Sequence, residues 1–198
     1  MDCTEILQLL SLVLNKITQA KTIEQEVYAM LVTMFPTIIA PALEIIDHGK
    51  ITKLICQKSR RHFYLVKDPQ QQSSGGQSSG GPSNNTRKPY LEVINDANDA
   101  QNTHLIYGDF CFSYFFAKEC LSPSENGSAP ISKYILAVKL AEALSNTDDI
   151  SGASPPGVIL VKEIDDRDFA PLLLQSRAYL SKYEEAKSPL SGGTKVST

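Results

Sequence analysis

The sequence predicts an α+β protein with N-terminal helices, a small antiparallel sheet, a ββα unit and a C-terminal helix. Three observations lead to this class. Apolar residues recur at helical spacing through 2–47, short β-branched and aromatic runs follow between 51 and 107, and helical spacing returns after 131. The order of helices, strands and helices lacks the βαβ alternation of a doubly wound sheet, which favours an α+β arrangement.

The first three helices are predicted over 2–19, 22–34 and 37–47. Each of the first two carries an apolar stripe on one face, and that stripe indicates a helix packed against a core. Thr22 and Gln25 fit a capping box, which predicts the start of the second helix.

The middle of the chain changes to the spacing of strands. Strands are predicted at Ile51–Cys56 and His62–Lys67, and again at Tyr90–Ile94 and Thr103–Tyr107. Between them, the stretch 68–89 is rich in Gln, Ser, Gly and Asn and has almost no apolar side chain, so we expect a disordered insertion.

The last part of the chain is predicted to return to helices. We expect an aromatic helix over 110–120, a helix over 131–144, a strand over 158–161, and a helix capped by Asp165 or Asp166 that runs to about 187. The segments are therefore these: helical region 1–49, hairpin 50–67, insertion 68–89, ββα unit 90–145, linker 146–157, strand and helix 158–187, and disordered tail 188–198.

Composition narrows the class of function. A net charge of −3 over 198 residues gives no overall attraction to nucleic acid, so any such contact needs a local patch or a partner. The four cysteines form no Cys-x-x-Cys pair, which is typical of free thiols in a reducing compartment. We expect no signal peptide, because the N-terminus has acidic Asp2 and Glu5 and an amphipathic rather than a continuous apolar run. We expect no membrane span, because no apolar stretch approaches 18 residues.

One pattern in 107–138 carries most of the functional information. An Asp-x-Cys (Asp109, Cys111) precedes an aromatic run, and a Ser-x-Tyr (Ser132, Tyr134) opens an Ile-Leu-Ala-Val helix. This frame resembles a SWIM-type zinc finger, in which a Cys-x-Cys and a Cys-x-His supply the four metal ligands. Three of the four positions here are neither Cys nor His, so the frame resembles a degenerate SWIM ββα unit.

A wider likeness runs upstream through Phe35-Pro36 and the Ala-Leu-x-x-x-Asp helix at 42–47, and it resembles the SWIM subunit of the Shu complex. The resemblance implies a non-enzymatic role in homologous recombination and DNA damage repair in the nucleus. It implies a recombinase-paralog protein as direct partner and, through that partner, a RecA-family recombinase on single-stranded DNA.

No cofactor is expected, although the family binds structural zinc. Ser and Tyr hydroxyls ionise far above neutral pH and are poor zinc ligands. We expect Tyr134, Phe110 and Phe112 to fill the space instead. His104 could be a further metal ligand, but we expect it to have a surface or packing role. Replacement ligands from elsewhere, for example His62, Cys56 or Cys120, stay open.

Three further surfaces are candidates. Lys58, Arg60 and Arg61 form a basic cluster on the predicted 57–61 turn, and the alternative function is direct nucleic-acid binding there. A separate hypothesis, of another class, is a small hydrolase that uses Cys111 or Cys120. The apolar faces of the first two helices could dock a partner. The candidates for a partner surface in the aromatic run are Phe112, Tyr114, Phe115 and Phe116.

Overall fold

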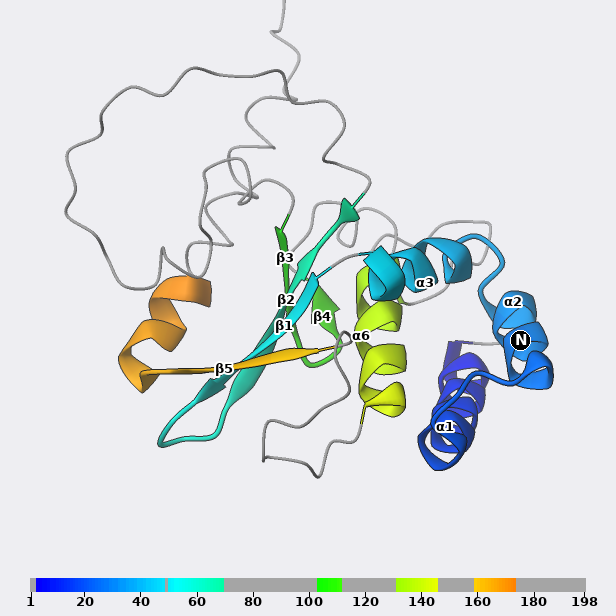
Figure 1. Ribbon diagram of the computed structural model, residues 1–198, viewed down its shortest axis with the longest axis horizontal. Helices are drawn as coiled ribbons and strands as arrows, with labels where there is room; N and C mark the ends of the chain where they lie inside the picture. The colour runs from blue at the N-terminus through cyan, green and yellow to red at the C-terminus, as the bar shows by residue number, and fades with distance from the viewer. Residues whose placement is uncertain (1–2, 49, 70–102, 112–130, 146–158, 174–198) are drawn as a thin grey trace, which may run out of the picture.

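The fold is built on a five-stranded sheet with strand order β4-β3-β2-β1-β5 (Figure 1). The computed structural model of the protein describes residues 3–48, 50–69, 103–111, 131–145 and 159–173. Its helices are α1 (Cys3–Ala20), α2 (Gln25–Met34), α3 (Ile39–His48), α6 (Lys133–Leu144) and an unlabelled helix at 166–173. Its strands are β1 (Lys50–Cys56), β2 (His62–Lys67), β3 (Thr103–Tyr107), β4 (Phe110–Cys111) and β5 (Leu160–Ile164).

The α+β class is confirmed, and the sheet is mixed. Strands β1 to β4 pair antiparallel with their neighbours, as expected of hairpins. Strand β5 instead pairs parallel with β1, with Thr52 opposite Leu160 and Cys56 opposite Ile164. The sequence predicted this strand at 158–161, and its described part lies at 160–164.

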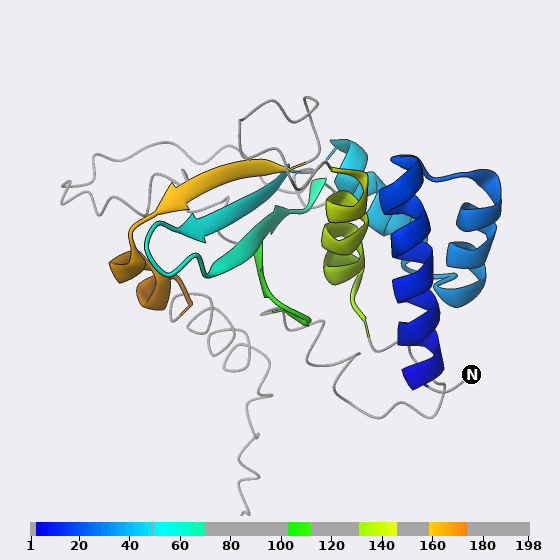
Figure 2. The same ribbon diagram turned by 90° about the horizontal axis from the view of Figure 1, so that it is seen from below.

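Helices cover both faces of the sheet (Figures 1 and 2). Helix α6 lies between the sheet and α1, and it contacts β2, β3 and β4 on one side and α1 and α3 on the other. Its Ile-Leu-Ala-Val-rich sequence is apolar nearly all round, and this suits a helix enclosed on both sides. Below the opposite face, helix 166–173 places Phe169 and Leu172 in a second, smaller core with Phe63.

Two helix starts differ from the prediction. Helix α2 begins at Gln25 and its N-cap is Glu24, whose side chain makes no capping hydrogen bond, so the Thr22 capping box is wrong. Lys21 ends α1 with a left-handed φ of 56°, and Thr22 therefore falls in the connection. Helix α6 begins at Lys133 rather than residue 131, because Ser132 is extended and its hydroxyl accepts from the Ile135 N–H at 3.3 Å.

The predicted helix at 110–120 is wrong at its start. Phe110 and Cys111 form β4, which pairs with Tyr107 and Ile106 of β3 through a two-residue turn. Gly108 takes a φ of 59° in that turn, a conformation open to glycine and costly for other residues. The chain thus turns back into a hairpin before any helix can begin, and residues 112–120 lie outside the described part.

Strand β2 has its predicted bounds, but the start of the predicted insertion differs from the prediction. Asp68 and Pro69 were assigned to the insertion predicted at 68–89. Asp68 is instead buried, with 1% of its surface exposed. The rest of that insertion, and the strand predicted at 90–94, lie outside the described residues. The capping role of Asp165 is confirmed, since its Oδ1 accepts from the Arg167 N–H at 2.9 Å.

None of the helices in the described part of the chain combines the length and apolar character needed to span a bilayer.

Candidate functional site

Three of the four positions of the SWIM-like frame lie together at the junction of β4 and α6. Cys111 is buried at the end of β4, while Ser132 and Tyr134 are buried at the start of α6. Asp109 is the exception. It sits on the hairpin turn with its side chain 81% exposed, and its carboxylate pairs with Lys139 at 2.6 Å.

A buried hydrogen-bond network occupies this junction. The Tyr134 hydroxyl donates to Asp68 Oδ2 at 2.9 Å, and the Lys133 ammonium donates to the same oxygen at 2.8 Å. Burial raises the pKa of Tyr134, and the Asp68 charge raises it further, so the phenol keeps its proton and acts as a donor. The network joins the end of β2 to the first turn of α6.

His104 closes the cluster from β3. Its imidazole stacks on the Tyr134 ring, with centroids 3.8 Å apart and planes 24° from parallel. Burial lowers the pKa of His104 to about 4; the Asp68 carboxylate raises it and the Lys133 ammonium lowers it, both less strongly. The imidazole is therefore neutral at pH 7, and its Nε2 is a buried polar atom with no hydrogen-bond partner. Of the surface or packing role predicted for His104, the structure shows packing.

In the described part of the chain, no three His, Cys, Asp or Glu side chains are grouped so that they could hold a metal ion. Of the replacement ligands left open, Cys56 lies in the core on the opposite face of the sheet, His62 packs edge-on against Tyr64, and Cys120 lies outside the described residues.

Tyr134 is buried at this junction, but the two phenylalanines do not join it within the described structure. Phe110 is 41% exposed on the hairpin, because the alternation of β4 turns its neighbour Cys111 inward. Phe112, together with the candidate partner residues Tyr114, Phe115 and Phe116, lies outside the described part of the chain.

The other end of α6 is fixed to the sheet by the same combination of residue types. The hydroxyl of Tyr64 on β2 hydrogen-bonds to the Glu142 carboxylate on α6, which also pairs with Lys53 of β1 at 3.3 Å. Burial raises the pKa of this tyrosine as well, and the Glu142 hydrogen bond adds to the shift. A tyrosine, a carboxylate and a lysine thus hold each end of α6.

The basic cluster lies at the tip of the β1–β2 hairpin, where acidic residues of the C-terminal segment face it. Arg60 pairs with Glu163 at 3.3 Å, and Arg61 lies 4.0 Å from Asp166 and stacks over the Phe169 ring at 4.6 Å. The backbone N–H groups of Lys58 and Ser59 both donate to the Asp166 carboxylate.

The carboxylates of Glu163 and Asp166 therefore hold the hairpin tip against the segment that follows β5. Hydrogen bonds from Ser59 and Lys58 lower the pKa of Asp166, so the carboxylate stays charged beside Arg61. The local positive charge that phosphate binding requires is reduced, since two of the three candidate cations already face carboxylates.

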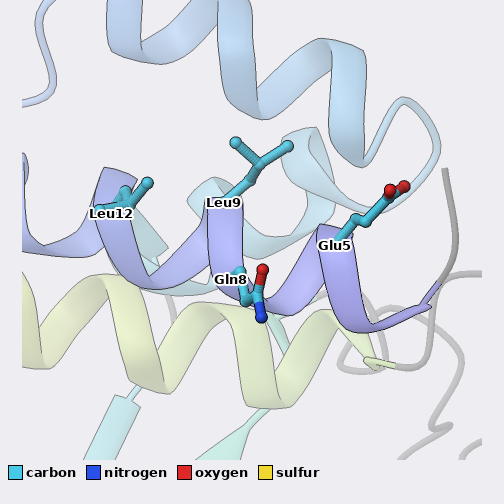
Figure 3. A pocket seen from close by; sticks show the side chains of 4 residues that line it. All are labelled: Glu5, Gln8, Leu9 and Leu12. Atoms are coloured by element: carbon cyan, nitrogen blue, oxygen red, sulfur yellow. The ribbon is translucent and has the colours of Figure 1, made fainter.

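The outer face of α1 carries a shallow hollow of about 400 Å³ (Figure 3). Glu5, Gln8, Leu9 and Leu12 line it, at the spacing of one helical face, and Leu9 and Leu12 point toward the side where α2 lies. Leu12 is 61% exposed. The buried stripe of the same helix, including Val13 and Ile17, faces the core, so the predicted apolar face is a core face.

Sequence reasoning missed Asp68, which holds the cluster together. A signal was present, because Tyr64 and Val66 face α6 and the period of two continues to Asp68. The Gln- and Ser-rich composition that follows concealed it.

No family model matches the chain, and neither the curated proteins nor the solved structures contain a match to it.

Proposed function

We propose that this chain is a non-catalytic subunit of a Shu-like recombination mediator. In this role it stabilises a recombinase-paralog partner and so promotes assembly of a RecA-family recombinase on single-stranded DNA. The observation that carries the proposal is the resemblance of the 107–138 frame to a SWIM unit, together with the burial of Cys111, Ser132 and Tyr134 at one hairpin–helix junction.

The geometry of that junction supports a structural role for the unit. In a SWIM finger, a metal links the hairpin to the helix. Here Tyr134, Asp68 and Lys133 link sheet and helix through two short hydrogen bonds to one carboxylate oxygen. Hydrogen bonds to a buried charge are among the stronger ones in proteins, so they can fix the helix against the sheet without a metal.

A non-catalytic assignment agrees with how these groups are engaged. The titratable side chains of the cluster bond or stack on one another, and the His104 Nε2 is buried away from solvent. Such groups can hold a fold together, and they offer little to a substrate in water.

Affinity purification from the cells that make the protein tests the proposal. We expect the tagged full chain to recover a protein with a RecA-like core, identified by mass spectrometry. A matched control replaces Leu136, which is 0% exposed in α6, with Asp, because this change disrupts the unit while leaving the surface sequence intact. The proposal fails if the folded wild-type chain recovers no recombinase paralog.

A further inference from the structure

Among the described residues, no strand pairs with the outer edge of β5, and this edge is a candidate surface for a partner. Strand β5 is the last in the strand order of the described sheet, with β1 on its inner side. Four of its five residues are exposed, and Leu160 and Val161 keep 57% and 52% of their surface in solvent. An edge strand with exposed apolar residues is a template for the addition of another strand.

The register of the sheet identifies the backbone groups that face outward. The Ile164 carbonyl accepts from the Gln57 N–H at 3.0 Å, so Ile164 directs its backbone groups toward β1. Along a strand, successive residues direct their N–H and C=O groups to alternate sides. Val161 and Glu163 therefore present theirs to the open edge.

A second copy of this chain fits that edge poorly. A two-fold axis centred on Lys162 or on Glu163 would place like charges directly opposite each other, which destabilises a strand pair. An axis centred on Val161 avoids this clash but sets Leu160 against Lys162 of the second copy. The edge is better matched by a strand of different sequence.

We propose that an extended segment of the partner protein adds to β5 as a sixth strand, bonded to the backbone of Val161 and Glu163. The segment would carry an apolar residue opposite Val161 and an acidic one opposite Lys162. Glu163 needs no basic residue from the segment, since Arg60 already pairs with it at 3.3 Å. The inference rests on the proposed function, because it takes the recombinase paralog as the source of the strand.

A proline substitution tests the backbone contact directly. Val161→Pro removes an outward N–H and leaves the bonds between β5 and β1 in place, and proline is tolerated at such edge positions. We expect about tenfold or greater loss of partner binding. Val161→Thr is the matched control, since it replaces one methyl group of the side chain with a hydroxyl and retains the N–H, and it should bind far better than the proline variant. Unfolding temperatures of both variants show that the fold is retained.

Hydrogen exchange of the full chain, alone and with the recovered paralog, gives a second measurement that needs no substitution. The amides of Val161 and Glu163 should exchange about tenfold or more slowly in the complex, while that of Lys162, which faces β1, changes little. Binding of the paralog with unchanged exchange at both residues would overturn strand addition and leave the proposed function standing.

If no paralog binds at all, the proposed function itself fails, and strand addition by this partner fails with it. A stable dimer of the chain alone, lost in Val161→Pro, would identify a second copy as the occupant and overturn the inference.

Discussion

Replacing Tyr134 with Phe removes one oxygen atom from the buried cluster. The ring stays in place against His104, 3.8 Å away between centroids, so packing changes little. The Asp68 carboxylate, 1% exposed, loses the donor that lies 2.9 Å from its Oδ2. We therefore expect a loss of stability without a change of fold.

The size of the effect follows from the charge of the acceptor. A hydrogen bond to a charged group contributes about 1.5–3 kcal/mol, so we take a loss of about 2 kcal/mol. For a chain of this size, that corresponds to a fall of about 4–8 °C in the unfolding temperature. Thermal and urea unfolding followed by circular dichroism measure both quantities.

Tyr28→Phe is the control, since it removes the same atom from a side chain that is 43% exposed on α2, and it should change stability by less than about 0.5 kcal/mol. A double-mutant cycle with Asp68→Asn should give a coupling of about 1–2 kcal/mol between the two positions. The reasoning is refuted if Tyr134→Phe has the unfolding temperature of the wild type, or if the double-mutant cycle shows no coupling.

Three further predictions concern pH, metal and nucleic acid. The pKa of His104 is about 4 in the fold against an ordinary 6.5, so between these pH values the unfolded chain binds more protons than the folded chain. The free energy of unfolding of the wild type should therefore fall by about 3 kcal/mol from pH 7 to pH 4, relative to that of His104→Phe. Urea unfolding that shows the same pH dependence for both proteins would contradict this. Elemental analysis should find no stoichiometric zinc, and chelator should leave the unfolding temperature unchanged; a fall restored by zinc would revive a site at Cys111. The double substitution Arg60→Ala and Arg61→Ala should lower the free energy of unfolding by less than about 1 kcal/mol and leave single-stranded DNA binding unchanged. If the wild type binds single-stranded DNA in a salt-dependent way and this variant does not, the nucleic-acid alternative is favoured.

The local elements could be predicted because their signals are local. Helix α1 and the β1–β2 hairpin follow from periods of 3.6 and 2 in the sequence, and the structure has them within a residue or two of the expected bounds. The Thr22 capping box failed because a left-handed Lys21 ended the preceding helix, and no sequence pattern marks a lysine for that conformation.

The non-local features could not be predicted in the same way. Nothing in the sequence of 160–164 specifies that it pairs parallel with β1, since edge selection depends on the assembled sheet. At the candidate site, the frame led to Cys111, Ser132 and Tyr134, which lie together. Asp68 was missed because the Gln- and Ser-rich sequence after it concealed the strand period that reaches it, and its hydrogen bonds form only when the end of β2 meets the start of α6.

The pairing of β5 with β1 has a consequence for synthesis of the chain on the ribosome. The backbone N–H groups of Lys58 and Ser59 donate to Asp166, which lies 108 and 107 positions later in the sequence. A nascent chain that ends before β5 lacks the strand that covers the outer edge of β1 in the described sheet, and contacts of such long separation form slowly. The N-terminal helices can fold early, whereas the described sheet is complete only once β5 has emerged from the ribosome, and the uncovered edge favours aggregation until then.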